Sequence, residues 1–511
     1  MSNHCDYDIV RYPSLVHAQL HPARLAAIAA LHGVPAASPS TCNLLEVGCG
    51  DGLQLLALAQ AYPRATFTGI DLSATAIARG ERLRAALGLG NLRLVAGDLL
   101  DWEPTTGPCD FIVAHGFYSW VPEPVRDRLL ALCGSHLAPG GIACISYNTL
   151  PGGHLRRMLW DIMRFHADDA SDPGARVARA LECLDLLEAG MPEGERYTRV
   201  MAEEISALRG RLDPGVLFHD DLAATNEPCT LDRFVRHARG NGLEFLAEAS
   251  YHEMSLQRVG DGARQLLEEI GRDDPVTKEQ YLDFMKGRRF RQTLLCRAEA
   301  RPRPAADAAV VAGLHLSTRL RPRQDAGTDA GMRDYDHPSS GTLATADPVL
   351  KGMLDACADA NSHPLPVQAL LDAARAAVPD AATRDQDLAR VCDALLRAYA
   401  AGLVDLLLDP APFARLVPER PVASPLARAT AADGQRLVPS LRLHMVEIAG
   451  TASLALLAAL DGSRDRAALQ AQVARECGTA DAGTIEMALR GFVEMALLCA
   501  DDDIDGPGPA C

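Results

Sequence analysis

Short apolar runs alternate with longer segments of helical periodicity through the first third of the chain. Five runs have the length and apolar character of buried strands: residues 44–47, 65–70, 92–96, 111–114 and 142–146. Segments between them, such as 53–61 and 125–137, repeat apolar residues at helical spacing. This alternation predicts a doubly wound parallel sheet of the α/β class over residues 1–165, with its ligand above the carboxyl ends of the strands.

A glycine-rich loop follows the first strand. Gly48, Gly50 and Gly52 stand between this strand and the helix predicted at 53–61. Glycine permits positive φ and lets a ligand approach the backbone. A dinucleotide-binding loop instead runs G-x-G-x-x-G and places a pyrophosphate at the helix N-terminus. Glu46, inside the strand, would repel a phosphate but suits a cationic amine, so the loop favours S-adenosylmethionine over a dinucleotide.

Acidic residues end the next two predicted strands. Asp71 closes the second strand, where a carboxylate can accept hydrogen bonds from both ribose hydroxyls. Gly97, Asp98 and Leu99 follow the third strand, where the acid can take the adenine amino group and the leucine can pack on the ring. Because the carboxyl ends of parallel strands share one edge of a sheet, these features predict one cofactor site.

The composition narrows the class of protein. The 511 residues are too many for one core, and 48% hydrophobic with 23% charged residues is typical of soluble globular proteins. Because the net charge is −17, a nucleic-acid backbone and an anionic membrane are unfavourable as main partners. The first residues lack the features of a signal peptide, and no apolar run approaches the roughly 20 residues of a membrane span. We therefore predict a cytoplasmic protein without stable membrane insertion.

The 14 cysteines are scattered, with no C-x-x-C pair and no histidines at zinc spacing. They are interpreted as reduced thiols, many of them buried. Cys49 lies inside the glycine loop, where a small residue that fits a crowded turn is favoured over a nucleophile. His219, Asp220 and Asp221 could bind a metal, but three adjacent side chains rarely point at one ion, so capping and a hydrogen-bonded turn are favoured. No metal is expected.

Aromatic residues gather at two places near the predicted ligand edge. Tyr7 and Tyr12 lie in an N-terminal arm that either folds back as a lid on the site or supplies packing anchors. Phe117, Tyr118 and Trp120 follow the fourth strand, in a chain with only 5% aromatics. At the mouth of an α/β sheet such residues would line a substrate channel. Capping of the core is the alternative, and it is favoured for Phe117.

Two segments beyond the sheet combine helices with short strands. Residues 213–297 are expected to form short helices, one of them at 231–240, and a strand at 243–249. Residues 301–338 are rich in Pro, Gly, Asp and Arg, which indicates a linker, with a strand around 313–320.

Helical patterns dominate the remaining segments. Residues 175–210 predict helices that supply a dimer face, a lid or an internal core pair. Residues 348–408 give three helical stretches and a strand, in a winged-helix-like order. Acidic residues at the start of the third helix, 384–387, would repel DNA phosphates, so a scaffold or protein-docking role is favoured over DNA binding. Residues 440–500 repeat a similar helical theme, and 501–511 form an acidic tail.

Several motifs are similar to those of class I S-adenosylmethionine-dependent methyltransferases: residues 46–52, 69–73, 97–98 and 139–141. More narrowly, the chain resembles bacterial methyltransferases that carry a methyltransferase regulatory domain, a group that includes protein-lysine methyltransferases acting on outer-membrane proteins. The narrower resemblance is carried by residues 12–14, 115–122, 146–152, 217–222, 226–228, 441–444 and 460–466. Leu443 separates Arg442 from His444, where the family usually has Leu-Arg-His.

The resemblance implies a Rossmann-like class I methyltransferase sheet followed by helical and winged-helix-like accessory domains. The expected parts are a methyltransferase domain at 1–165, a helical insertion for dimerisation or a lid at 166–212, a regulatory domain at 213–300, a linker with a winged-helix-like middle domain at 301–415, and a C-terminal helical domain with the acidic tail at 416–511. The cofactor would be S-adenosylmethionine, with S-adenosylhomocysteine as product. Expected cofactor-binding residues are Tyr12, Glu46, Gly48, Cys49, Gly50, Asp51, Gly52, Asp71, Leu72, Gly97, Asp98, Leu99 and His115.

The expected cofactor sets the demands on the acceptor side. Methyl transfer from a sulfonium is an in-line displacement, so the protein mainly has to align donor and acceptor in a dry channel. A lysine acceptor must first lose a proton, and desolvation in an aromatic channel lowers its pKa from about 10.4. Tyr118, Trp120 and Tyr147 are expected to form the channel wall, and Asn148 to orient the amine through its side-chain oxygen.

We therefore expect a methyltransferase that acts on lysine side chains of a protein substrate, since the large accessory part suits a folded protein better than a metabolite. A small-molecule methyltransferase with regulatory domains is one alternative. A non-catalytic sensor that binds S-adenosylmethionine is another, although a complete aromatic channel counts against it. A homodimer is a further expectation, and nucleic acid is not an expected partner.

Overall fold

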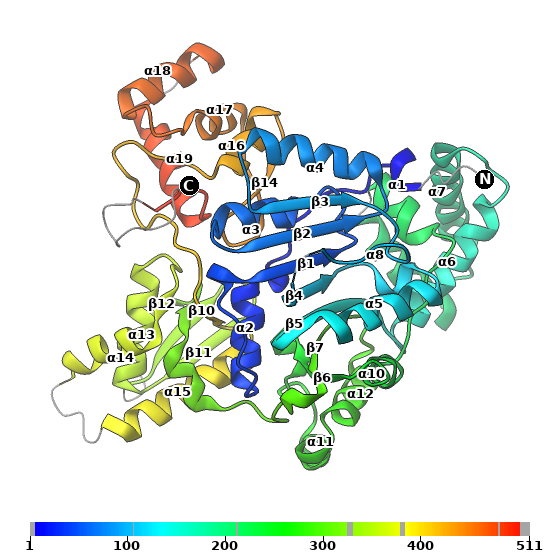
Figure 1. Ribbon diagram of the computed structural model, residues 1–511, viewed down its shortest axis with the longest axis horizontal. Helices are drawn as coiled ribbons and strands as arrows, with labels where there is room; N and C mark the ends of the chain where they lie inside the picture. Colours follow the sequence, from blue (N-terminus) through cyan, green and yellow to red (C-terminus); the bar gives the residue numbers. More distant parts are fainter. Residues whose placement is uncertain are drawn as a thin grey trace.

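The computed structural model describes residues 6–105, 107–210, 213–323, 331–378, 384–478 and 481–500. Its centre is a seven-stranded sheet in the order β3-β2-β1-β4-β5-β7-β6 (Figure 1). Strands β1 to β5 are parallel, while β7 runs antiparallel to both β5 and β6. The strands are β1 (Asn43–Val47), β2 (Thr66–Asp71), β3 (Leu92–Ala96), β4 (Cys109–Ala114), β5 (Leu137–Asn148), β6 (Leu243–Glu248) and β7 (Phe290–Arg297).

The Rossmann-like sheet is confirmed, but the expectation that it is entirely parallel is corrected. Strands β6 and β7 come from the segment that follows the helical insertion, and the sequence pattern predicts only the first of them. Arg291, Gln292 and Thr293 place three polar residues in β7, which hides its apolar character although all three are buried. The boundary expected at residue 165 therefore separates segments that share one sheet.

Alternate residues of the strands enter two cores on opposite faces of the sheet. Leu44 in β1 and Phe111 in β4 pack with helices α2 and α3, whereas Leu45 and Ile112 pack with α5 and α10. This is the doubly wound arrangement that the sequence predicts. The helices of this part are α1 (Asp6–Ile9), α2 (Pro22–Leu31), α3 (Leu53–Ala61), α4 (Ala74–Ala86), α5 (Glu123–His136) and α10 (Leu231–Arg239), with short helical turns η1 (Ala18–Leu20), η2 (Pro39–Thr41) and η3 (Tyr118–Trp120).

The start of β5 differs from the prediction. Helix α5 ends at His136 and β5 begins at once, so the strand includes the segment expected to be a turn before residue 142. Gly140 has a φ of +79°, and a Cβ atom there would lie 2.5 Å from the carbonyl oxygen of Pro35. Glycine therefore lets the strand pass close to the segment that precedes β1.

The helical insertion forms a satellite core. Its helices are α6 (Gly153–Ala167), α7 (Pro173–Gly190) and α8 (Arg196–Arg209), and the last two correspond to the pair predicted at 175–210. Leu159, Leu184 and Ile205 from the three helices pack together and against Leu217 of the regulatory segment. One face of the pair therefore supplies an internal core, and dimerisation through the insertion stays a prediction.

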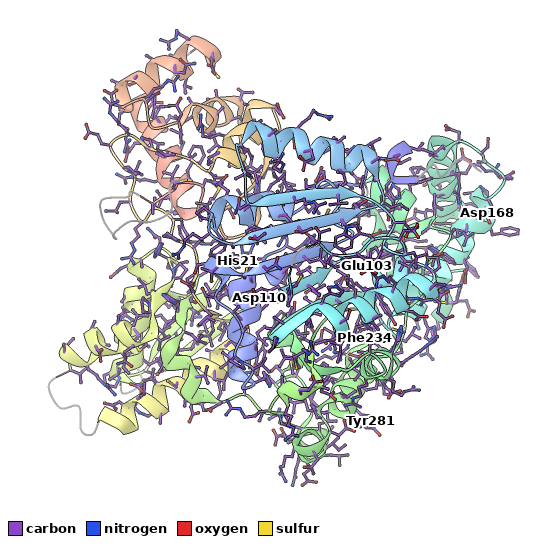
Figure 2. The ribbon with its side chains drawn as sticks, viewed as in Figure 1. His21, Glu103, Asp110, Asp168, Phe234 and Tyr281 are labelled. Atoms are coloured by element: carbon purple, nitrogen blue, oxygen red, sulfur yellow. The ribbon has the colours of Figure 1, made fainter. Side chains whose placement is uncertain are left out.

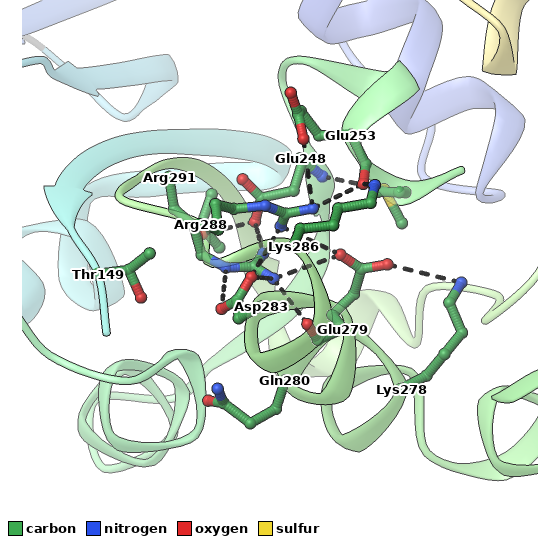
Figure 3. Close-up of polar contacts among 12 residues, drawn as sticks. Thr149, Glu248, Glu253, Lys278, Glu279, Gln280, Asp283, Lys286, Arg288 and Arg291 are labelled. Atoms are coloured by element: carbon green, nitrogen blue, oxygen red, sulfur yellow. Dashed lines mark hydrogen bonds and ion pairs between the residues drawn. The ribbon is translucent and has the colours of Figure 1, made fainter. Parts of the chain in front are cut away.

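The regulatory segment is held by buried ion pairs (Figure 3). Arg291, whose side chain is fully buried, donates two hydrogen bonds to Asp283 (2.8 and 2.9 Å) and one to Glu248 (2.5 Å). Arg288 lies 3.2 Å from Asp283 and 3.4 Å from Glu279. Other elements of the segment are α9 (Pro214–Val216), η4 (Leu217–Asp221), η5 (Tyr251–Met254), α11 (Asp261–Asp273), α12 (Pro275–Lys286) and η6 (Ala298–Ala300).

The middle domain shares its apolar core with the catalytic sheet. The Arg24 guanidinium at the start of α2 donates to Asp405 (2.6 Å), and the Leu408 N–H donates to the Ala23 carbonyl (2.9 Å). These contacts fix the domain against helix α2 of the catalytic part. Its elements are η7 (Ala308–Gly313), β8 (His315–Ser317), β9 (Arg321–Pro322), β10 (Arg333–His337), β11 (Gly341–Thr345), α13 (Pro348–Asp359), β12 (Leu365–Pro366), α14 (Val367–Ala376), α15 (Arg384–Ala400) and β13 (Asp405–Leu407).

The C-terminal domain has a core of its own, which includes Leu457, Leu489 and Phe492. It contacts the catalytic part through Gln60, which accepts the Leu426 N–H (2.9 Å) and donates to the Ser424 hydroxyl (3.0 Å). Its elements are α16 (Pro425–Ala432), β14 (Leu437–Pro439), β15 (Met445–Glu447), α17 (Thr451–Ala459), α18 (Arg466–Cys477) and α19 (Ala482–Glu494).

Some expectations fall outside the described residues: the N-terminal residues 1–5, part of the linker at 324–330, the side chains of 384–386 and the acidic tail at 501–511. Asp387, which completes the acidic start of the third middle-domain helix, forms a 2.6 Å ion pair with Arg390. Within the described part of the chain, no helix combines the length and the apolar character needed to cross a membrane.

Candidate functional site

The glycine loop forms the floor of the site at the carboxyl end of β1. Gly48, Gly50 and Gly52 have φ values of +73°, +57° and +72°, so each adopts a conformation that other residues rarely take. A Cβ atom at Gly48 or Gly52 would lie 2.7 Å from Phe117 or Leu94, whereas a Cβ atom at Gly50 would meet no atom within 4 Å. Gly50 therefore borders open space that a ligand can fill.

Glu46 supplies a buried carboxylate beside this loop. Its side chain is 7% exposed, and its Oε2 atom has no hydrogen-bond partner in the described part of the chain. Burial, with smaller contributions from Asp71 and Asp51, raises the pKa of Glu46 to about 8. A buried carboxylate without a partner is costly, and a cationic ligand group would relieve that cost. The residues present therefore fit the ammonium group of S-adenosylmethionine.

Asp71 ends β2 and is fixed by the backbone. Its Oδ2 atom accepts the Gly50 N–H and its Oδ1 atom accepts the Ser73 N–H, both at 2.8 Å. Each carboxylate oxygen has two lone pairs, so both can still accept a ribose hydroxyl. Since one oxygen also holds the glycine loop, Asp71 connects loop geometry to ligand binding.

The predicted adenine corner is divided between exposed and buried residues. Asp98 is exposed, next to the half-buried Gly97, and its carboxylate accepts the Leu100 N–H at 2.9 Å. Leu99 is 5% exposed and belongs to the core that packs against α5, whereas Leu72 is 56% exposed. Of the two leucines, Leu72 therefore has the free apolar face that a base could cover.

The N-terminal arm lies across the carboxyl ends of the strands. The Ser14 hydroxyl donates to Asp51 in the glycine loop, and the His17 N–H donates to Gln54 (2.8 Å). The His17 ring lies 4.2 Å from the ring of His115 at the end of β4. These contacts hold the arm against both the glycine loop and the fourth strand.

The arm also contacts the regulatory segment. Tyr7 stacks on His219 with ring centres 4.0 Å apart, and Tyr12 meets the same ring edge-on at 5.9 Å. The His219 ring lies 2.8 Å from the Val10 carbonyl, and Asp221 accepts two hydrogen bonds from Arg156 (2.8 and 2.9 Å). The tyrosines of the arm therefore pack against the regulatory segment, as the packing-anchor alternative expects, and a lid role stays a prediction. Among the described residues, no group of three or more His, Cys, Asp or Glu could hold a metal ion.

Tyr118 and Tyr147, expected on the channel wall, lie inside the core. They are 5% and 1% exposed, and both rings contact Phe234 of α10, which Figure 2 labels. The Tyr118 hydroxyl lies 2.9 Å from His237, and that of Tyr147 lies 3.0 Å from the Thr293 hydroxyl. Because their rings are buried, these tyrosines pack in the core next to the site and do not line a channel. Trp120, in η3, is only partly buried.

Asn148 joins the sheet to the regulatory segment. Its backbone N–H donates a hydrogen bond to the Ser119 hydroxyl (2.9 Å), and its Nδ2 group donates to the Asn226 Oδ1 atom (3.0 Å). Because Nδ2 is engaged, the side chain offers its Oδ1 atom as an acceptor for another group. The sequence shows the motif at 226–228 that contains Asn226, but no local pattern predicts its contact with Asn148.

Phe290 is a site residue that the sequence analysis missed. It lies opposite Asn148 in the β5–β7 register, and its ring stands edge-on to His115 at 5.8 Å. Its side chain is 41% exposed. Burial, and then His17, lowers the pKa of His115 to about 3, so its imidazole is neutral beside this exposed ring. Recognising β7 as a strand would have placed Phe290 at the site.

Family models match three parts of the chain. Residues 44–141 match a methyltransferase domain, 213–297 a predicted methyltransferase regulatory domain, and 419–487 a PKMT C-terminal winged helix domain. The uncharacterized protein RP028 of Rickettsia prowazekii (strain Madrid E) is 31% identical over 246 residues, which cover 48% of this chain and 98% of RP028. The chain belongs to the S-adenosylmethionine-dependent methyltransferases that carry a regulatory domain.

Two further proteins are similar to the chain over different lengths. The uncharacterized protein RP789 of Rickettsia prowazekii (strain Madrid E) is 34% identical over 297 residues, 58% of this chain, and the match spans about half (53%) of its length. The fold matches that of PKMT2 from Rickettsia typhi, solved in complex with AdoHcy, with a TM-score of 0.84, 24% identity, and coverage of 95% of this chain and 99% of that one.

The segment of this methyltransferase that matches a winged-helix model lies closer to the C-terminus than residues 348–408, where the sequence predicts a winged-helix-like order. It covers most of the C-terminal domain, whose short β14–β15 pair and helices α16 to α18 fall within residues 419–487. The middle domain also combines three helices with short antiparallel strands. Both accessory domains therefore combine helices with short antiparallel strands, and a repeat of one architecture stays a prediction.

The buried carboxylate of this methyltransferase gives a pH prediction. With the pKa of Glu46 at about 8, the free protein holds a proton at pH 6 that must leave before the carboxylate can pair with an ammonium group. Affinity for S-adenosylhomocysteine should therefore rise about tenfold per pH unit between roughly pH 6 and 7.5. Calorimetry in buffers of different ionisation enthalpy should also detect release of about one proton on binding.

The matched controls are Glu46→Gln and Glu103→Gln. The first should flatten the pH profile, because an amide does not titrate, and the second alters an exposed carboxylate and should leave the slope intact. A flat profile in the unmodified protein would contradict the pairing of Glu46 with the cationic group.

Proposed function

We propose that this protein transfers a methyl group from S-adenosylmethionine to the side-chain amine of lysine in a protein substrate. The cofactor supplies an electrophilic methyl group for in-line displacement. The observation that carries the proposal is that the catalytic and regulatory parts meet where β4 and β5 end, through Asn148 with Asn226 and His115 with Phe290, and we assign the acceptor side to this place. An acceptor site formed by residues of both parts suits an enzyme whose additional domains bind the substrate.

The chemistry around these residues suits an amine. An amine acceptor must be neutral to attack, and an aromatic, poorly hydrated surface favours the neutral form. The Asn148 Oδ1 atom can accept an N–H of the amine and so direct its lone pair. His115 is uncharged at neutral pH and adds no repulsion to a cationic cofactor or product. The exposed Phe290 ring can stabilise a methylated ammonium through its face.

The accessory domains favour a protein substrate over a metabolite. They extend over both the middle and C-terminal parts of the chain, and a metabolite would not need that surface. The C-terminal domain matches a model described as a PKMT winged helix domain, and the whole fold matches a protein named PKMT2. These likenesses support, by analogy, a role in protein methylation.

The experiment is incubation of the purified chain with methyl-labelled S-adenosylmethionine and a lysate of its source cells. The products are separated into precipitable protein and soluble small molecules. Label in discrete protein bands, traced by mass spectrometry to lysine, is the expected result. Label confined to the soluble fraction would instead establish a small-molecule methyltransferase. Tight cofactor binding with no transfer to either fraction would favour a sensor.

Asn148→Ala should lower the rate of labelled methyl transfer to protein by roughly 10- to 100-fold, because loss of orientation costs about 1.4–2.8 kcal/mol. Affinity for S-adenosylhomocysteine should stay within about twofold, since Asn148 acts on the acceptor. Asn241→Ala is the control, because Asn241 donates to the His237 carbonyl and lies outside the site. Full activity of Asn148→Ala would remove the proposed role of Asn148.

A further inference from the structure

A cleft of about 390 Å³ lies between the middle and C-terminal domains, which sit on the same side of the sheet in Figure 1. The middle domain contributes Arg319, Arg321 and His337 to its lining, and the C-terminal domain contributes Arg442 and Glu494. None of these residues belongs to the methyl-transfer site. The cleft is of the size that holds small ligands, roughly 300–1,000 Å³.

The lining carries an excess of positive charge. Within the described ranges, none of Arg319, Arg321 and Arg442 has a carboxylate at ion-pair distance. Asp336 also lines the cleft, but two hydrogen bonds from Arg323 neutralise it (2.6 and 2.9 Å). Such a local cluster of arginines is unexpected in a chain whose net charge is −17.

Glu494 is the other acidic residue of the lining, and Asp405 lies close enough to act on Arg442. Asp405 is itself engaged by Arg24 at 2.6 Å. The lining therefore contains three arginines and two acidic residues, Asp336 and Glu494, of which Asp336 is already paired with Arg323. The nearby Asp405 is paired with Arg24.

Arg442 ties the two domains together at the cleft. Its guanidinium donates to the carbonyl oxygens of Asn361 (3.2 Å) and Glu494 (3.3 Å) and stacks over Phe413 at 4.7 Å. Its Nε atom is buried and has no hydrogen-bond partner among the described residues. Burial, and then Arg319 and Arg321, lowers the pKa of Arg442 to about 10. A cation in this position is incompletely satisfied.

We propose that this cleft binds a small oxyanion ligand, a phosphorylated or polycarboxylic metabolite, which bridges the two accessory domains. Phosphate and carboxylate groups match the planar fork of arginine and can pair with more than one guanidinium at once. The ligand would neutralise the charge that Arg319, Arg321 and Arg442 concentrate there. This inference is independent of the proposed methyl acceptor.

The test is isothermal titration calorimetry of the full chain with inorganic pyrophosphate and, separately, with citrate. At least one of them should bind saturably at one site per chain. The double variant Arg319→Gln/Arg321→Gln should weaken that binding at least tenfold, and the affinity should fall as salt is raised. Arg490→Gln is the control, because Arg490 lies one turn from Glu494 on α19 but not in the lining, and its affinity should stay within about twofold.

Thermal unfolding provides a second readout that does not depend on Arg442, whose packing on Phe413 makes its own replacement hard to interpret. The bound anion should raise the unfolding temperature of the unmodified chain and not that of the double variant. Binding of pyrophosphate alone would assign a phosphorylated ligand, and binding of citrate alone a polycarboxylate. No saturable binding of either at roughly 1 mM, or equal binding by the double variant, would overturn the proposal.

Discussion

Asp71→Ala is expected to weaken the binding of S-adenosylhomocysteine by roughly 100-fold or more. Hydrogen bonds to a charged partner contribute about 1.5–3 kcal/mol each, and the carboxylate is placed to accept both ribose hydroxyls. The substitution also releases the Gly50 N–H, which Asp71 accepts at 2.8 Å, so the glycine loop loses its anchor. Isothermal titration calorimetry of the purified protein measures the effect directly.

Asp110→Ala is the matched control for this prediction. Asp110, labelled in Figure 2, accepts the Asn43 N–H at 2.8 Å and so joins β1 to β4 near the amino ends of these strands, away from the site. We expect it to reduce stability by about 1.5–3 kcal/mol, since the lost hydrogen bond is made to a carboxylate. Affinity should stay within about twofold, because Asp110 lies away from the site. Unchanged affinity in Asp71→Ala would remove the assignment of the cofactor site.

Arg291→Met is expected to destabilise the β6–β7 edge of the sheet by about 3–5 kcal/mol. The fully buried guanidinium pairs with Asp283 and Glu248, so its loss leaves the buried Glu248 without this ion-pair partner and Asp283 with Arg288 alone. The damage should reach the site, because Thr293 donates to Glu248 and also contacts the Tyr147 hydroxyl. Methyl transfer should therefore fall together with stability.

Hydrogen exchange at the amides of β6 and β7 is the suitable measurement, because a chain with several cores does not unfold in one step. Protection there should drop by roughly 150- to 4,000-fold, as about 3–5 kcal/mol implies. Arg323→Met is the control, since Arg323 forms solvent-exposed ion pairs in the middle domain and should change stability by less than about 1 kcal/mol. Equal protection in the two variants would contradict a structural role for the buried network.

Local sequence accounts for much of the catalytic half. Helix α3 and strand β3 begin and end at the predicted residues, and the glycine loop has the positive φ values that its composition requires. These features depend on short-range periodicity and on the conformational freedom of glycine, both of which are written within a few residues. The family resemblance then named the cofactor class and the regulatory segment.

Burial of individual side chains was less accessible to the sequence. An aromatic residue at the end of a strand suits a channel wall and a core equally well, and only the packing of Phe234 against Tyr118 and Tyr147 distinguishes the two. The same holds for Leu72 and Leu99, of which the predicted adenine neighbour is the buried one. Which face of a residue stays open depends on what another segment places over it.

The sequence by itself determined the order of strands β1 to β5 and the helices between them, the glycine loop and the acids at the strand ends, because each follows from residues close together in the chain. Only the tertiary structure decided that β7 completes the sheet, that Asn148 meets Asn226 across 78 positions, and that Arg442 enters a cleft with two arginines of another domain. Such contacts join residues far apart in the chain and depend on long-range packing, so no local sequence pattern predicts them.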